Sequence, residues 1–308
     1  MRRESTPGLA QEPLSPAWLA QSERSQTFVM RAYAWVALAL GRRLARLILH
    51  PISLYFLLFS VQARTASRTY LRKVLAREPR LSEVYRHYHT FAATILDRVY
   101  LLNGQYSGFE VRTFNEDIVR EMIARGEGGF LLGAHVGSFE VLRSLGRDAR
   151  GLKVRMVMYE ENAKKVNAVV NAINPAVAGD VIGLGKLDSM LKVERALTKG
   201  EFVGMLADRT IQGEGTIPAS FLGAAVRIPA GPFRIAAIMK RPVVIMFGLY
   251  RGANRYDIHF ERLVDMGGVE RGTRDAVIEQ AVRTYVERLE HYCRLAPYNW
   301  FNFYDYWR

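Results

Sequence analysis

The sequence lacks most of the features that mark common enzyme classes. Its single cysteine, Cys293, excludes an internal disulfide framework and suits a reducing compartment. The six histidines form no His-Glu-x-x-His pair, and His87 and His89 have no evident third ligand, so we expect no metal site. There is no Gly-x-Ser-x-Gly elbow and no P-loop ending in Gly-Lys-Ser/Thr. Chemistry that depends on any of these motifs is therefore not indicated.

Acidic residues are scarce relative to basic ones. The 308 residues contain 30 Asp and Glu against 43 Lys and Arg, which leaves a net charge of +13. Such a surplus predicts an anionic partner: nucleic acid, a phospholipid surface or an acidic carrier protein. The aromatic residues do not interleave with the basic ones, and no zinc-finger, RRM or helix-turn-helix pattern is found, so we expect no nucleic-acid partner.

Long apolar runs are also missing, although the N-terminal part is rich in apolar residues. Residues 28–40 are nearly all apolar, and the pattern resumes over residues 47–61 after three arginines, Arg42, Arg43 and Arg46. Neither run reaches the roughly 20 residues that span a bilayer. We expect a pair of helices that lie in or dip into one leaflet, with the arginines among anionic headgroups. Two core helices of a soluble protein are the alternative.

A basic stripe follows this apolar region. Arg64, Arg68 and Arg72 are spaced four apart and would share one face of a helix. Because they follow the apolar segment, we expect them to contact anionic membrane lipids or an acidic carrier protein. A solvated helix face is the alternative.

The remainder of the chain has an α/β pattern. Helices are expected over residues 64–103, with a break near Pro79, and over a long amphipathic stretch at 273–294. Strands are expected at 129–133, 154–159, 181–184, 202–207, 243–250 and 256–260, and the helices between them at 139–146, 163–173, 187–198 and 232–240. We therefore predict an α/β fold: a mixed, largely parallel central sheet flanked by helices, with an N-terminal membrane-associated helical extension. The expected division is a flexible N-terminus at 1–26, a membrane-associated helical region at 27–75 and an α/β domain at 76–308.

The strongest candidate for chemistry is the segment Gly-Ala-His-Val-Gly-Ser-Phe-Glu. His135 directly follows an apolar strand, where open α/β sheets place their ligand sites, and Glu140 follows five positions later. A turn at Gly137 would bring the two side chains together, so that the carboxylate orients the imidazole as a general base. A substrate hydroxyl can then be the attacking group. The alternative is a histidine satisfied locally at a turn, with Glu140 capping the helix start.

A second group lies at another predicted strand end. Asp208 and Arg209 could orient a substrate or bind a phosphate, or they could form a structural ion pair. A segment with several glycines follows, from Gly213 to Gly223, and leads to Arg227 and a Pro-Ala-Gly-Pro stretch.

Taken in order, these segments resemble the lipid A biosynthesis acyltransferase family, within the lysophospholipid acyltransferase superfamily. The match is carried by the arginine-interrupted apolar N-terminus, the His135–Glu140 segment, Met-Leu-Ala-Asp208-Arg209, and Phe221-Leu-Gly223 before Pro-Ala-Gly-Pro. The resemblance implies His135 as general base and Glu140 as its orienting partner. It places Asp208, Arg209, Phe221, Gly223 and Arg227 in the substrate-binding region.

The same resemblance implies a reaction and a location. An acyl group passes from an acyl carrier protein or acyl-CoA thioester, as co-substrate, to a hydroxyl of a lipid or glycolipid acceptor, without a cofactor. The enzyme would be peripheral or monotopic at the cytoplasmic face of a bacterial inner membrane. Loop amides of residues 133–137 or a nearby arginine are candidate donors to the oxyanion.

Two departures from the family pattern concern the acceptor. Residues 158–165 are acidic before they are basic, and the C-terminal tail is aromatic rather than basic. They suggest a divergent branch that acts on another amphiphile, such as an aryl polyene pigment or an aminolipid. A non-catalytic lipid-binding or assembly protein of the same fold, and a thioester or lipid hydrolase, are the alternative functions.

Overall fold

The computed structural model describes residues 16–142, 151–159, 170–171, 174, 181–185, 188–210 and 215–307. Most of the N-terminus expected to be flexible, most of the helix expected at 163–173 and most of the acidic-then-basic stretch at 158–165 lie outside the described residues.

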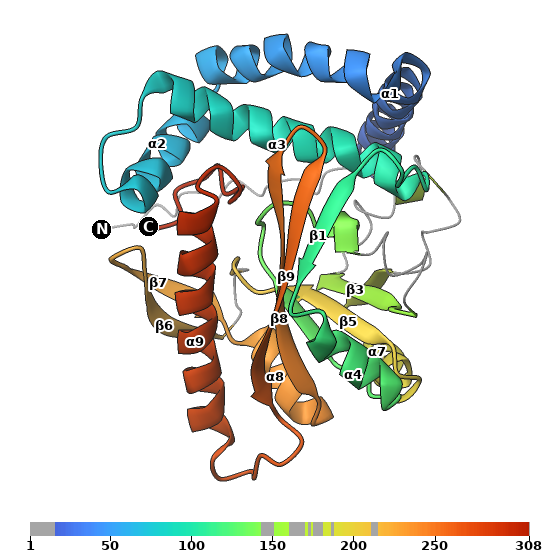
Figure 1. Ribbon diagram of the computed structural model, residues 1–308, viewed down its shortest axis with the longest axis vertical. Helices are drawn as coiled ribbons and strands as arrows, with labels where there is room; N and C mark the ends of the chain where they lie inside the picture. The colour runs from blue at the N-terminus through green and yellow to red at the C-terminus, as the bar shows by residue number, and fades with distance from the viewer. Residues whose placement is uncertain are drawn as a thin grey trace, which may run out of the picture.

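A seven-stranded sheet forms the centre of the molecule (Figure 1). Its strands, in spatial order, are β1 (Glu110–Phe114), β9 (Arg255–Asp265), β8 (Pro242–Gly252), β2 (Phe130–Gly133), β5 (Phe202–Leu206), β3 (Val154–Tyr159) and β4 (Val181–Leu184). Neighbouring strands run parallel except for the antiparallel pair β8 and β9. The predicted mixed, largely parallel sheet is confirmed.

The middle strands are buried on both faces. Strand β2 is buried along its whole length, and β5 is buried up to its last residue. Central strands of parallel sheets are covered by helices on both faces, so their sequences are continuous apolar runs rather than alternating ones. This is why Phe-Leu-Leu-Gly and Phe-Val-Gly-Met-Leu were recognisable as strands.

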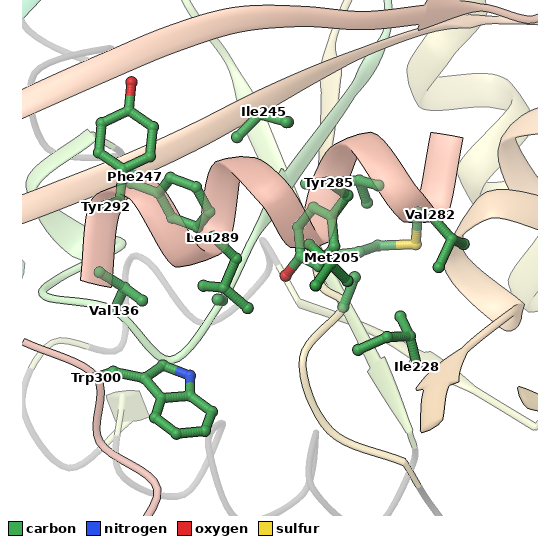
Figure 2. Packing of buried hydrophobic residues seen from close by; sticks show 14 of the residues in the cluster. Val136, Met205, Ile228, Ile245, Phe247, Val282, Tyr285, Leu289, Tyr292 and Trp300 are labelled. Atoms are coloured by element: carbon green, nitrogen blue, oxygen red, sulfur yellow. The ribbon is translucent and has the colours of Figure 1, made fainter. Parts of the chain in front are cut away.

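Helices flank this sheet. They are α4 (Asp117–Ala124), α7 (Ser189–Thr198), α8 (Gly231–Met239) and the long α9 (Arg274–Leu295). Helix α9 buries Ile278, Val282, Tyr285 and Leu289, which recur every three or four residues and so share one face. Figure 2 shows this face packed among strand residues such as Phe247 and Met205, with Trp300 and Val136 at one end of the cluster. Each fully buried side chain of this size contributes about 1.5–3 kcal/mol through the hydrophobic effect.

Within the described residues, three helices precede the sheet: α1 (Pro16–Phe59), α2 (Val61–Leu75) and α3 (Leu81–Leu102). Helix α1 is kinked at Gly41, whose φ of 72° lies in the positive range that favours glycine. Pro51 also lies within α1. In Figure 1, α1 and α3 lie across one end of the sheet. None of the described helices is by itself long and apolar enough to cross a bilayer. The segments Trp35–Phe59 and Val61–Leu75, bent by 95°, reach that length and composition only as a pair.

Helix α1 is fastened to helix α3 and to the β8–β9 hairpin through two of the arginines that interrupt its apolar pattern. Arg42 forms a bidentate ion pair with the buried Asp97, with Nε–Oδ1 and Nη2–Oδ2 distances of 2.8 and 2.9 Å. Arg46 donates to the Tyr250 hydroxyl at 2.7 Å and to the Ala253 carbonyl at 2.7 Å. These two side chains therefore bind the protein itself, while Arg43 is exposed.

A separate hairpin, β6 (Thr216–Phe221) and β7 (Ala224–Pro229), was not expected from the sequence. Leu222 and Gly223 form its turn, with φ values of 51° and 75°. Two consecutive positive φ angles are typical of the two-residue turns that join antiparallel strands. Part of the glycine-containing segment is thus a β-hairpin.

Candidate active site

His135 and Asp208 occupy equivalent positions on neighbouring strands. Strands β2 and β5 are parallel, with Gly133 paired to Leu206, and each of the two residues lies two positions beyond that pair. The Ala207 amide donates to the Gly133 carbonyl at 3.0 Å, so the two chains stay together past the strand ends. The geometry places both side chains at the carboxyl edge of the sheet, where α/β proteins bind ligands.

The two side chains are hydrogen-bonded to each other. His135 Nδ1 lies 2.8 Å from Asp208 Oδ1, and the His135 backbone amide donates to Asp208 Oδ2 at 3.1 Å. Asp208 is fully buried, whereas the His135 side chain is 29% exposed. Within the described part of the chain, no group hydrogen-bonds to His135 Nε2. One ring nitrogen is thus bound by a carboxylate, and the other is left for a ligand.

Asp208 is surrounded by donors. Besides the two groups of His135, the Trp300 indole N–H and the Asn302 amide donate to Oδ2 at 3.0 and 3.1 Å. Burial alone would raise the pKa of Asp208, but the charge and hydrogen bond of His135, the charge of Arg209 and the Asn302 hydrogen bond hold it well below its usual range. The carboxylate is ionised, so it requires a proton on His135 Nδ1. That tautomer leaves Nε2 as a hydrogen-bond acceptor.

The C-terminal tail pairs with the His135 loop. The Phe301 amide donates to the His135 carbonyl, and the Gly137 amide donates to the Asn299 carbonyl, both at 2.8 Å. Val136 and Trp300 form an antiparallel bridge between these bonds. Trp300 and Asn302 are the site residues that sequence reasoning missed. In the sequence, the aromatic tail stands out only as a departure from the family pattern.

Gly137 allows the His135 loop to approach strand β8. Its φ is +61°, and a Cβ at this position would lie 1.9 Å from the Gly248 carbonyl oxygen. The next amide, of Ser138, donates to that same oxygen at 2.8 Å. No side chain fits here, which gives the predicted turn at Gly137 its physical reason.

Glu140 forms an ion pair with Arg98 of α3. Arg98 Nη2 lies 3.1 Å from Glu140 Oε2, and the Glu140 side chain is 14% exposed. The carboxylate hydrogen-bonded to the His135 ring is that of Asp208. Glu140 therefore has a basic partner on α3, and its assignment as the orienting partner of His135 stays a prediction.

Arg209 is engaged by the tail. Its Nε donates to Asn302 Oδ1 at 2.6 Å and its Nη2 to the Phe301 carbonyl at 2.8 Å. The guanidinium also lies over the Tyr304 ring, 5.7 Å from the centroid. In this arrangement Arg209 holds the segment that carries the donors to Asp208.

The other residues assigned to substrate binding lie on the hairpin. Phe221 is fully buried and packs against Trp300, Tyr306 and Trp307. Gly223 and Arg227 are exposed, and Arg227 donates to the Thr216 hydroxyl at 3.1 Å. Phe221 thus packs against the aromatic side chains of the C-terminal tail. The structure does not bring Gly223 or Arg227 into hydrogen-bonding contact with His135 within the described residues.

The basic stripe on α2 has acidic neighbours. Arg64 donates to the Leu57 carbonyl at 2.9 Å and so caps the end of α1. Arg68 and Arg72 both pair with Glu78, while about half of each arginine side chain remains exposed. An anionic surface would compete with Glu78 for these two side chains.

The amides proposed as oxyanion donors are partly in use. Those of His135 and Gly137 already donate to Asp208 and Asn299. These two amides are therefore not free to bind an oxyanion.

No group of His, Cys, Asp or Glu side chains suited to a metal ion is found among the residues that the structure describes.

This arrangement suits general-base catalysis. The imidazole is held through Nδ1 by a buried carboxylate, and the His135 side chain remains partly exposed. The family model described as bacterial lipid A biosynthesis acyltransferase matches residues 18–308, which include all of these residues. The chain belongs to this family. As a lipid A biosynthesis acyltransferase, it is a transferase of lipid biosynthesis. A comparison with curated proteins finds no significant match.

Proposed function

We propose that the protein transfers an acyl group from a thioester, of acyl carrier protein or CoA, to a hydroxyl of a lipid acceptor. The observation that carries the proposal is the hydrogen bond between His135 Nδ1 and the buried, ionised Asp208. It supports a histidine in the tautomer that a general base requires.

A single base, His135, is sufficient for both proton transfers of the reaction. His135 Nε2 takes the proton of the acceptor hydroxyl while the oxygen attacks the thioester carbonyl carbon. The C–O bond forms, the C–S bond of the tetrahedral intermediate breaks, and the imidazolium returns the proton to the leaving thiolate. Asp208 stabilises the imidazolium throughout.

A direct assay tests the function. Purified protein is incubated with the lauroyl thioester of acyl carrier protein or with lauroyl-CoA, and with a lipid A precursor or an aryl polyene lipid as acceptor. We expect an acylated lipid that His135→Ala abolishes, while the variant retains the circular dichroism spectrum of the unaltered protein. Free fatty acid as the main product would instead identify a hydrolase. Retained transfer in His135→Ala would overturn the base assignment.

We also propose that α1 docks on the cytoplasmic face of a bacterial inner membrane. The supporting observation is a set of large apolar side chains exposed on α1 and at the start of α2: Trp35, Val36, Leu40, Leu44, Leu47, Ile48, Leu54, Tyr55, Phe56, Leu58, Phe59 and Val61. A patch of this kind marks an interaction surface. A bent amphipathic segment beside basic residues suits the interface of an anionic bilayer.

Vesicle flotation tests the docking. With vesicles of phosphatidylethanolamine and phosphatidylglycerol, Phe59→Asp should lower the membrane partition coefficient about tenfold to a hundredfold, because one buried aromatic side chain contributes roughly 1.5–3 kcal/mol. Leu191→Asp is the matched control, since Leu191 is an exposed apolar residue on α7. Equal binding by both variants would contradict the assignment of α1 as the docking element.

A further inference from the structure

His87 is a buried histidine at the junction of α2, α3 and the C-terminal tail. Its Nδ1 lies 2.8 Å from the Ser67 hydroxyl on α2, and its Nε2 lies 2.8 Å from the Trp300 carbonyl oxygen. The residue is fully buried, as is Ser67. The His87 ring is therefore shielded from solvent.

The two hydrogen bonds define the tautomer of His87. A backbone carbonyl only accepts hydrogen bonds, so Nε2 must carry the proton that is donated to Trp300. In the neutral ring Nδ1 is then an acceptor, and the Ser67 hydroxyl donates to it. Burial lowers the pKa of His87 to about 4, against the opposing effect of the Trp300 hydrogen bond, so the ring is neutral near pH 7.

Trp300 connects this histidine to the active site. Its carbonyl is held by His87, and its indole N–H donates to Asp208 Oδ2 at 3.0 Å. Its backbone lies between the two hydrogen bonds that join the tail to the His135 loop. Asp208 in turn holds His135 Nδ1 at 2.8 Å.

We propose that His87 is a positioning residue for the general base: by fixing the Trp300 carbonyl, it places the indole N–H on Asp208 and so holds His135 in its working tautomer and orientation. The proposal rests on the proposed role of His135 as base. It assigns helices α2 and α3 a part in catalysis through a chain of hydrogen bonds from Ser67 to His135.

A purely structural role is the competing explanation. The His87 ring also packs against Tyr70, Phe301 and Phe303, with centroid distances of 5.4, 6.2 and 4.7 Å. If packing alone mattered, an apolar side chain of similar volume would serve equally well in every molecule that folds. The two explanations therefore differ in what the N–H donor contributes.

Two substitutions at His87 separate these explanations. His87→Leu keeps much of the volume and removes the donor, whereas His87→Gln keeps an amide N–H near the position of Nε2. We expect His87→Leu to lower kcat about tenfold to a hundredfold with KM for the lauroyl carrier-protein thioester and for the lipid A precursor unchanged. His87→Gln should recover most of the lost kcat. Rates are compared per folded molecule.

Nuclear magnetic resonance of protein labelled with 15N-tryptophan provides a readout that does not require turnover. The Trp300 indole N–H resonance, assigned with Trp300→Phe, should shift in His87→Leu and return toward its original position in His87→Gln. Ser67→Ala is the second variant should His87→Leu not fold. It removes only the hydroxyl that fixes Nδ1, so we expect a smaller shift of the same resonance and a fall of a few-fold in kcat.

The outcomes are distinct. The role of His87 would be overturned if His135→Ala is inactive but His87→Leu has an unchanged kcat and an unmoved Trp300 resonance. Ser67→Ala replaces His87→Leu in this comparison should His87→Leu not fold. In that case the base assignment stays intact. Retained transfer in His135→Ala would instead overturn the proposed mechanism itself. A loss in His87→Leu that His87→Gln does not relieve would assign His87 to packing.

Discussion

His135 and Asp208 each lie two residues beyond paired positions of adjacent parallel strands, and this common offset brings Nδ1 to 2.8 Å from Oδ1. The Asp208 carboxylate accepts from four donors: the His135 amide and ring, the Trp300 indole and the Asn302 amide. It is therefore both rigid and ionised.

Asp208→Asn should lower kcat about 10³- to 10⁴-fold with little effect on folding. The Asn oxygen can keep the donors that now contact Oδ2, so its NH2 group faces His135 and forces Nδ1 to accept. The proton then sits on Nε2, which can no longer act as a base. The same exchange in serine proteases lowers kcat about 10⁴-fold through the wrong tautomer. Steady-state kinetics test this, and a kcat within tenfold of the original would contradict the orienting role of Asp208.

Arg98 and Glu140 should behave as a coupled pair. Their ion pair is partly buried, so removing either charge takes a favourable interaction away from the other. We expect Arg98→Met and Glu140→Gln each to lower kcat and the free energy of unfolding, and the double variant to lose less than their sum, with a coupling of about 0.5–3 kcal/mol. Denaturant unfolding and kinetics on all four proteins measure it. Strict additivity would show that the pair is not a unit.

Trp300→Phe should reduce activity more than Trp307→Phe does. The first removes a donor to Asp208 at 3.0 Å, whereas the Trp307 indole donates at 3.4 Å to the Phe221 carbonyl. Both substitutions keep an aromatic ring. Loss of one hydrogen bond to a buried charged group costs about 1.5–3 kcal/mol. Similar kcat values for the two variants would exclude a special role for the Trp300 indole.

His87 should make stability depend on pH between about 6.5 and 4. Its pKa is about 4 in the folded protein, against 6.5 as the ordinary value, so within this window the unfolded chain binds the proton and the folded chain does not. Stability is complete above pH 6.5 and is lost as the pH falls, by up to about 3 kcal/mol at pH 4. Urea unfolding at several pH values should show a flatter profile for His87→Gln. An identical slope in both proteins would show that His87 is not neutral and buried.

Local sequence patterns predict where the strands are but not their spatial order in the sheet. An apolar run before His135 and another before Asp208 identify β2 and β5, and both residues were placed at strand ends. Their pairing was missed because β3 and β4 lie between them in the chain but at the outside of the sheet. Since neighbours in a parallel sheet are chosen by crossover connections, adjacent carboxyl ends cannot be identified from local pattern alone.

Other elements were missed because their local signals are weak. Strand β1, Glu-Val-Arg-Thr-Phe, lies at the sheet edge with none of its residues fully buried. Strand β6 contains Pro218, which argues against a strand unless it is at an edge. By contrast, α9 was predicted almost residue for residue, because its apolar face repeats over six turns. Tail residues such as Asn302 gain their role only through contacts with distant parts of the chain.

The hydrogen bonds around the tail also bear on the order of folding. They join residues 73, 94 and 213 positions apart in the chain: His135 to Asp208, Asp208 to Asn302, and His87 to Trp300. Contacts of such high sequence separation form slowly, because the entropy of closing a large loop is lost before the contacts contribute favourable free energy. Helices such as α3 and α9 contain mostly local contacts and need no such closure. During refolding, helical content should therefore return before acyl-transfer activity does. Recovery of activity then indicates that the hydrogen bonds between the most distant parts of the chain have formed.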